Sequence, residues 1–341
     1  MLFTNLSEVI KFKAEESGFS GAVAAFYKDK ETYKDAFGYR QREDQLPNTT
    51  DTRFGIASGC KLFTAIAVCQ LVDHGLLTFN SKLTECLDTA EFPYWDRGIT
   101  VHHLLTHSSG ISDYFDEDIM ENFEDLWIGQ PMYSLRRLAD FLPLFQQQPM
   151  KFPPGERFHY NNAGYILLGL IVEKLSGMEF AAYVEQHIFG PAGMKSSGYF
   201  SLDRLPPNTA CGYIDEKDGA WRRNIYSLPV KGGSDGGAFV SAPDMLLCWE
   251  ALLGYHLLSP ELTSLLLTPH IGEDRDNYYG YGVWISMNDG DIFKYHLMGS
   301  DPGVSFRSAF YPQTRAAVAM VCNASRGAYT LLKAFEEHLP Y

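Results

Sequence analysis

A serine and a lysine three residues apart, Ser58 and Lys61, open an apolar run that continues to residue 72 and ends near Gly75. The run contains no glycine or proline, so the sequence predicts a helix with Ser58 at its mouth, close to free backbone N–H groups and to the positive end of the helix dipole. At about 100° per residue, Lys61 lies on nearly the same face as Ser58 and about 4.5 Å further along the axis. An amine in this position can take the proton from a hydroxyl nucleophile.

The alternative is an N-cap serine beside an unrelated lysine, because so short a pattern occurs by chance in many proteins. The surroundings favour the catalytic interpretation. Lys61 is flanked by apolar residues, namely Ile56, Ala57, Leu62, Phe63 and Ile66. Burial among them disfavours the charged amine and makes it a usable base. Cys60 is a second possible nucleophile, but two positions along a helix it points away from the Ser58–Lys61 face, so we expect it to serve in packing.

Tyr160 and Asn162 form a second polar pair, just ahead of the apolar stretch from Tyr165 to Leu175. A tyrosine hydroxyl can carry a proton, and an asparagine amide can both donate to and accept from a substrate amide. The alternative is a packed tyrosine with a satisfied hydroxyl beside an asparagine that caps a helix.

His296, Gly299 and Ser300 lie at the end of a strand-like segment near the carboxyl end of the chain. A glycine there allows close approach to the strand edge, whose N–H groups can stabilise an oxyanion. The alternative is an ordinary turn after a strand.

Three histidines, His102, His103 and His107, form a cluster that could suggest a metal site. No glutamate accompanies them as in the H-E-x-x-H pattern, so structural hydrogen bonding is favoured over zinc. We therefore expect no metal and no organic cofactor.

The chain has 341 residues and a formal net charge of −14, which argues against nucleic acid and anionic membranes as partners. None of the six cysteines is in C-x-x-C spacing. No secretory signal and no run of 18 apolar residues is visible, so the sequence predicts a cytoplasmic protein without a membrane span. The oligomeric state stays open.

Strand-like segments occur near both ends of the chain, around a middle that is rich in helices and loops. A helix is predicted at about 6–16 and another at about 329–338. The predicted strands are 21–27, 31–39, 280–285, 292–297, 305–311 and 316–322. This order predicts an α/β (α+β) fold with one antiparallel sheet built from both termini and an inserted all-α lobe. We expect a single catalytic domain over 1–341, with a sheet lobe at about 1–57 and 226–341 and a helical lobe at about 58–225.

These elements, in this order, resemble the serine β-lactamase and penicillin-binding protein superfamily. The resemblance is strongest to its class C-like branch, which also holds D-alanyl-D-alanine carboxypeptidases, D-aminopeptidases and family VIII esterases. Ser58-x-x-Lys61 matches the nucleophile motif and Tyr160-Asn161-Asn162 the Y-x-N motif. Further family-like stretches are 99–110, 154–162 and 236–244, and the resemblance covers about residues 10–335.

The resemblance implies a β-lactamase/transpeptidase-like fold and a serine hydrolase that works through a covalent acyl-enzyme. Its substrate would be an ester or amide of a small or peptide-like molecule, and penicillins would acylate it. Ser58 would attack, Lys61 would act as general base, Tyr160 would carry or position the proton, and Asn162 would orient the substrate amide. The N–H groups of Ser58 and Ser300 would form the oxyanion hole.

This sequence departs from the third family motif, which is K-T-G or H-x-G. Gly299 stands at the glycine position of the motif and Leu297 at its Lys/His position. His296 lies one residue before the Lys/His position. One residue in a strand is a change of face. Either a bulge returns His296 to the cleft, or the cation that binds a substrate carboxylate is missing, which favours an esterase or amidase. The alternatives are a D-alanyl-D-alanine carboxypeptidase or β-lactamase, and a slow penicillin-binding protein that serves as a sensor or binding module.

Overall fold

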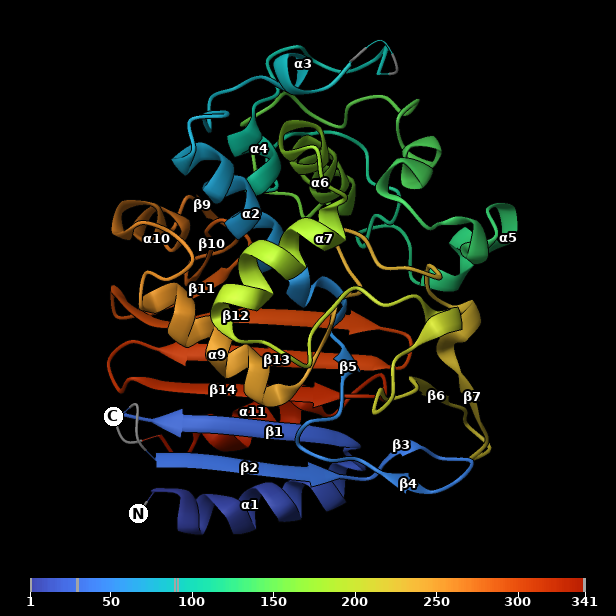
Figure 1. Ribbon diagram of the computed structural model, residues 1–341, viewed down its shortest axis with the longest axis vertical. Helices are drawn as coiled ribbons and strands as arrows, with labels where there is room; N and C mark the ends of the chain where they lie inside the picture. Colours follow the sequence, from blue (N-terminus) through green and yellow to red (C-terminus); the bar gives the residue numbers. More distant parts are fainter. Residues whose placement is uncertain (1, 29–30, 89, 91, 340–341) are drawn as a thin grey trace.

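The computed structural model describes residues 2–28, 31–88, 90 and 92–339. Its centre is an eight-stranded antiparallel sheet in the order β2-β1-β14-β13-β12-β11-β10-β9 (Figure 1). The strands are β1 Gly21–Tyr27, β2 Glu31–Phe37, β9 Ile271–Gly272, β10 Asn277–Tyr279, β11 Trp284–Asn288, β12 Asp291–Asp301, β13 Val304–Tyr311 and β14 Ala316–Cys322.

The two ends of the chain meet inside this sheet. Strand β1 pairs with β14, with Gly21 opposite Cys322 and Tyr27 opposite Ala316. All seven residues of β14 are buried, as expected of a central strand covered on both faces. The predicted antiparallel sheet built from both termini is therefore confirmed.

Helices cover both faces of the sheet. On one face α1 (Leu2–Ser17) packs with α11 (Ala328–Glu336) over a cluster of aliphatic and aromatic side chains. On the other face α9 (Ala242–Leu253) packs on β1 and β14. Beyond it lie α2 (Lys61–Asp73) and α6 (Asn162–Ser176), which pack against each other in the larger core cluster.

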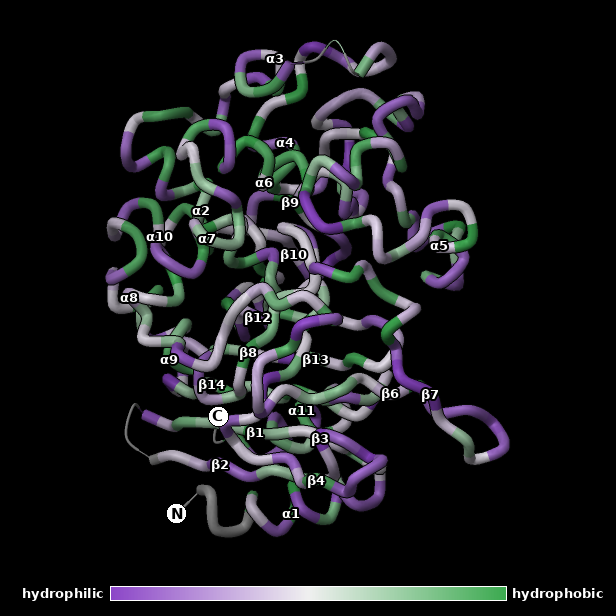
Figure 2. The backbone as a smooth tube through the Cα atoms, turned by 45° about the vertical axis from the view of Figure 1, so that its right-hand side comes forward, coloured by the Kyte–Doolittle hydropathy of each residue, from purple (hydrophilic) through white to green (hydrophobic). Residues whose placement is uncertain are grey.

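The remaining elements are short. The other strands are β3 Tyr39–Gln41, β4 Leu46–Pro47, β5 Phe54–Gly55, β6 Tyr213–Asp215, β7 Trp221–Arg223 and β8 Phe239–Val240. The other α-helices are α3 Leu83–Cys86, α4 Val101–Leu105, α5 Leu126–Gly129, α7 Phe180–Val184, α8 Gly190–Ala192 and α10 Pro260–Leu266. The β6–β7 hairpin projects from the body and is largely hydrophilic (Figure 2). None of the described helices is both long and apolar enough to cross a bilayer.

Two predicted strands have different bounds in the structure. The prediction of a strand at 280–285 is wrong over most of its length, because Gly280 and Gly282 lie in the connection between β10 and β11. Gly282 has a φ of +70°, and a Cβ there would lie 2.6 Å from the carbonyl oxygen of Lys61. The strand expected at 292–297 is instead the longer β12, which reaches Asp301 and thereby places Gly299 and Ser300 within the sheet.

Candidate active site

Ser58 lies in a 3₁₀ turn, η1 (Ala57–Cys60), that leads directly into α2. The residue before it, Ala57, has a φ of +45°, a conformation that costs energy for any residue with a Cβ. Two backbone hydrogen bonds hold the turn: Gly237 N–H donates to the carbonyl of Ala57 (3.2 Å), and Ile56 N–H donates to that of Ala238 (3.0 Å). The predicted position of Ser58 at a helix mouth is thus present, with one intervening turn of 3₁₀ helix.

The Lys61 side chain is 2% exposed, and its amine has three oxygen neighbours. Nζ lies 3.0 Å from Ser58 Oγ, 2.8 Å from Asn162 Oδ1 and 2.7 Å from the backbone oxygen of Asp235. The amide and carbonyl oxygens can only accept hydrogen bonds, whereas a hydroxyl can donate or accept. The amine therefore donates to Asn162 and Asp235, and the third direction faces the serine hydroxyl.

Asn162 begins α6, and its neighbour Asn161 caps that helix by accepting a hydrogen bond from Gly164 N–H (2.7 Å). While Asn162 Oδ1 faces Lys61, its Nδ2 donates to Asp113 Oδ2 (3.1 Å). Asp113 also accepts from the backbone N–H groups of Asn162 (2.8 Å) and Ala163 (2.9 Å). Both sides of the Asn162 amide are thus bound to protein groups. The predicted contact of this amide with a substrate stays a prediction.

Tyr160 lies beside the same amine. Lys61 Nζ is 4.9 Å from the centre of its ring, and the ring of His107 is 4.4 Å away on centroids. Burial, and then the carboxylate of Glu117, raise the pKa of Tyr160 well above its ordinary value, and a hydrogen bond with Ser58 opposes them. Tyr160 is therefore a neutral phenol that can donate a proton. It is not a resident phenolate base.

Gly299 brings β12 against η1, the turn that holds Ser58. A Cβ at this position would lie 2.0 Å from the carbonyl oxygen of Ile56 and 3.0 Å from the backbone nitrogen of Gly59. Only glycine permits that approach. The next residue, Ser300, lines the same cavity as Ser58, so the two N–H groups predicted to form an oxyanion hole belong to adjoining segments.

The structure does not bring His296 into this cavity. The pairing of β12 with β13 runs in unbroken register from Tyr295 to Asp301, so no bulge moves His296 onto the face of Gly299. His296 instead lies 3.2 Å from Ser286 Oγ, and burial lowers its pKa to about 3, which leaves the ring uncharged. Leu297 does share the face of Gly299, but it is 2% exposed and packs in the larger core cluster. Neither residue supplies a cation.

The other predicted histidines make contacts within the protein. His102 Nδ1 lies 2.9 Å from the Tyr281 hydroxyl, and His103 Nδ1 accepts from Thr100 N–H (3.2 Å). His107 Nδ1 accepts from Asn161 N–H (3.0 Å), which joins the turn after α4 to the loop segment that contains Tyr160. These contacts are of the structural kind that the sequence favoured.

One other group has the composition of a metal site. Ligand atoms of Asp116, Asp118 and His159 lie within 4.8 Å of one another. The Lys151 amine contacts the Asp116 carboxylate and lies 2.7 Å from His159 Nε2. A protein cation thus already neutralises the most buried acid of this group.

Sequence reasoning missed the residues that hold the lysine in place. Asp113 accepts hydrogen bonds from Asn162 and holds it in place. The hydroxyl of Tyr114 donates to the carboxylate of Asp235. The backbone oxygen of Asp235 in turn accepts from the Lys61 amine. Burial raises the pKa of Asp113 to about 7 and also raises that of Asp235. Neither acid lies in the S-x-x-K or Y-x-N motif, so no local pattern marks them. Cys60 is fully buried and its pKa is raised to about 12, which removes it as a thiolate nucleophile.

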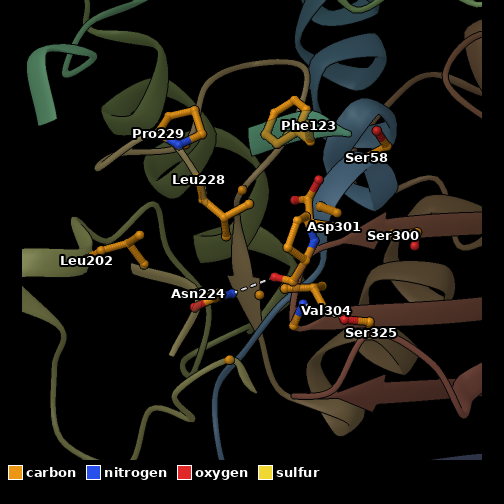
Figure 3. Close-up of a pocket in the computed structure, with 18 of the residues that line it drawn as sticks. Ser58, Phe123, Leu202, Asn224, Leu228, Pro229, Ser300, Asp301, Val304 and Ser325 are labelled. Atoms are coloured by element: carbon orange, nitrogen blue, oxygen red, sulfur yellow. Dashed lines mark hydrogen bonds between the residues drawn. The ribbon is translucent and has the colours of Figure 1, made fainter. Parts of the chain in front are cut away.

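A cavity of about 390 Å³ opens onto Ser58 (Figure 3). Polar groups on its wall include Ser58, Asn162 and Ser300. Apolar side chains line much of the rest, among them Phe123, Phe141, Leu202, Leu205 and Leu228. A pocket of this size, largely apolar with a few convergent polar groups, suits a small organic substrate.

Comparison with known proteins finds a matching family model and relatives that are named as penicillin-binding proteins or as an esterase. A family model described as Beta-lactamase matches residues 6–337. The crystal structure of a penicillin binding protein from Bacillus halodurans is 55% identical, covers 97% of this chain and 100% of that one, and superposes with a TM-score of 0.94. Penicillin-binding protein 4* of Bacillus subtilis (strain 168) is 33% identical over 214 residues, which are 62% of this chain and 45% of that protein.

An esterase, EstB of Burkholderia gladioli, is 31% identical over 255 residues, which are 71% of this chain and 62% of that protein. This chain therefore spans less than two thirds of the length of both of these curated relatives.

Proposed function

The chain belongs to the Beta-lactamase family, and from this premise we propose that it is a serine hydrolase that forms a covalent acyl-enzyme at Ser58. Its substrates are esters or amides of small or peptide-like molecules, and β-lactams are possible acylating agents. Relatives named as penicillin-binding proteins and as an esterase support a hydrolase. The observation that carries the serine mechanism is the 3.0 Å distance between Lys61 Nζ and Ser58 Oγ.

In the acylation step, Ser58 Oγ attacks the carbonyl carbon and its proton passes to Lys61 Nζ. A neutral amine has two N–H donors and one lone pair. The donors are engaged by Asn162 and Asp235, so the lone pair is directed at the serine hydroxyl. The backbone N–H groups of Ser58 and Ser300 stabilise the oxyanion, worth about 3–4 kcal/mol per donor in comparable sites.

Tyr160 completes the proton path. As a neutral phenol beside Ser58 and Lys61, it gives its proton to the leaving alcohol or amine and is reprotonated from the lysine. In the second step water attacks the acyl-enzyme carbonyl and loses a proton to the same pair of groups. Ser58 Oγ leaves as the hydroxyl, and the product acid is released.

The test is covalent labelling followed by intact-mass analysis. A fluorophosphonate, and separately an activated acyl ester, should each add one label that maps to Ser58. Ser58→Ala should abolish labelling, whereas Ser134→Ala, an exposed serine outside the cavity, should not. A label on another residue, or one that survives Ser58→Ala, would exclude the mechanism. An ester label that forms but is never released would favour the slow penicillin-binding alternative.

A further inference from the structure

The cavity next to Ser58 is acidic. Its described lining includes Glu117, Glu121, Asp235 and Asp301, and the basic side chain among them is Arg223. The Arg223 guanidinium is already bound, because its Nε donates to Glu43 Oε1 at 2.6 Å. Asp235 is likewise bound, by the hydroxyl of Tyr114. The electrostatic field that a substrate meets is therefore set by carboxylates that still have acceptor capacity.

Asp301 is the acid best placed to contact a substrate. It ends β12 on the same face as Gly299 and directly follows Ser300, whose N–H is proposed for the oxyanion hole. Its side chain is partly exposed and lines the cavity, between Ser58 and Ser300 on one side and Phe123 and Leu228 on the other (Figure 3). Within the described part of the chain, no side chain donates a hydrogen bond to this carboxylate or forms an ion pair with it.

Building on the proposed hydrolase, we propose that Asp301 binds a protonated amine of the substrate, so that the preferred acyl group carries an ammonium near the scissile carbonyl. Glu117, an exposed residue that lines the same cavity, adds negative potential. A substrate carboxylate would face these acids without a partner, because Leu297, at the Lys or His position of the family motif, is buried and uncharged. Unpaired or like charges in a partly desolvated site are strongly disfavoured.

The pKa of Asp301 fits a carboxylate that lacks a cationic partner within the described part of the protein. Burial, and then the neighbouring Asp235, raise the pKa of Asp301 to about 7, because no cationic side chain of the described residues pairs with this carboxylate. A bound cation favours the charged form by supplying the missing partner. The apolar walls formed by Phe123, Leu202 and Leu228 would then receive the rest of the substrate.

The proposal is tested with three p-nitroanilides that share one skeleton: 3-phenylpropanoyl (neutral), phenylalanyl (amine, D and L forms measured separately) and benzylmalonyl (carboxylate). The wild type should favour one enantiomer of the amine over the neutral compound by at least tenfold in kcat/KM, and the carboxylate should be the poorest. In Asp301→Asn the ratio of amine to neutral should fall at least tenfold. Asp301→Lys should raise the ratio of carboxylate to neutral.

The matched control is Asp291→Asn, an exposed aspartate at the other end of β12 and outside the cavity, which should keep the wild-type ratio. An amine preference that survives Asp301→Asn, or its absence in the wild type, would overturn the proposal.

Binding without turnover separates this inference from the proposed function. In Ser58→Ala, calorimetric titration should give at least tenfold tighter binding of phenylalaninamide, D or L, than of 3-phenylpropanamide, and the difference should vanish when Asp301→Asn is added. Equal affinities would reject the amine site even if Ser58 proved to be a nucleophile. An Asp301-dependent difference would support it even if the hydrolase proposal failed.

Discussion

Lys61 Nζ lies 2.8 Å from Asn162 Oδ1, a contact that joins the S-x-x-K and Y-x-N motifs across 101 residues of sequence. It ties the start of α2 to the start of α6, the two buried helices of the larger core. Asp113 holds the other side of the same amide. The orientation of the amine therefore depends on a chain of hydrogen bonds, from Asp113 to Asn162 to Lys61, and not on the lysine alone.

Asp113→Ala should weaken both catalysis and stability. The substitution removes the acceptor of two backbone N–H groups and leaves Asn162 Nδ2 with only its longer contact, 3.4 Å to the carbonyl oxygen of Phe115. A buried group without a partner costs about 1–3 kcal/mol. Thermal unfolding should detect the loss, and the acylation rate at Ser58 should fall by tenfold or more. Asp113→Asn keeps one acceptor oxygen, so its stability and acylation rate should lie between those of the wild type and those of Asp113→Ala. A destabilised variant with an unchanged acylation rate would reduce Asp113 to a purely structural role.

Lys61→Met should lower the rate of acylation by about 10²–10⁴, the usual contribution of a general base. Methionine fills a similar space without an amine, so the buried site keeps most of its packing. Stopped-flow measurement with a chromogenic ester gives the acylation rate directly. Lys174→Met, an exposed lysine on α6, is the control. Near-normal acylation in Lys61→Met would remove the lysine from the mechanism.

The sheet and the family could be predicted from the sequence because each had a local signal, and the site residues that we propose were chosen from the same kind of signal. The S-x-x-K spacing predicted that Ser58 and Lys61 face each other, as they do in the structure, and the strand-rich ends predicted the observed antiparallel sheet. The family resemblance and the β-lactamase/transpeptidase-like fold are confirmed. Asp113 and Asp235 could not be found in this way, because their role arises only when distant loops meet at the Lys61 amine. The bulge considered for His296 depended on strand pairing, which a single sequence does not specify.

Tyr160→Phe should reduce turnover at least tenfold while the melting temperature barely changes. The change removes one oxygen and keeps the ring that packs on His107. Tyr165→Phe is an informative control, since its buried hydroxyl donates to the carbonyl of Leu105 at 2.9 Å. That variant should lose stability and keep most of its turnover per folded molecule. If the two variants behave alike, Tyr160 has no special part in proton transfer.

His296 should make the protein sensitive to acid. Its pKa is lowered to about 3 in the folded protein from an ordinary 6.5. Between pH 6.5 and 3 the unfolded chain therefore binds more protons than the folded protein. The contribution of His296 to the free energy of unfolding falls as the pH decreases through this range. His296→Gln should lose less stability than the wild type between pH 6.5 and 4. At about 1.36 kcal/mol per unit of pKa, the difference should reach about 1 kcal/mol or more. Denaturant unfolding at each pH measures it. Parallel curves for the two proteins would mean that the ring is protonated without penalty.

Gly299→Ala should reduce activity by displacing β12 from the turn that carries Ser58. The added methyl group would lie 2.0 Å from the carbonyl oxygen of Ile56, so β12 and the turn that carries Ser58 must move apart. The two N–H groups proposed for the oxyanion hole then shift relative to each other, and a lost donor costs about 10²–10³ in rate.

We expect acylation to fall by at least that factor, with a loss of stability of about 2 kcal/mol or more. Gly129→Ala, where nothing lies within 4 Å of the added Cβ, is the control for the chemical change itself. A Gly299→Ala variant with full activity would mean that the approach of β12 to Ser58 is not needed for catalysis. The role proposed for Ser300 would then be lost with it.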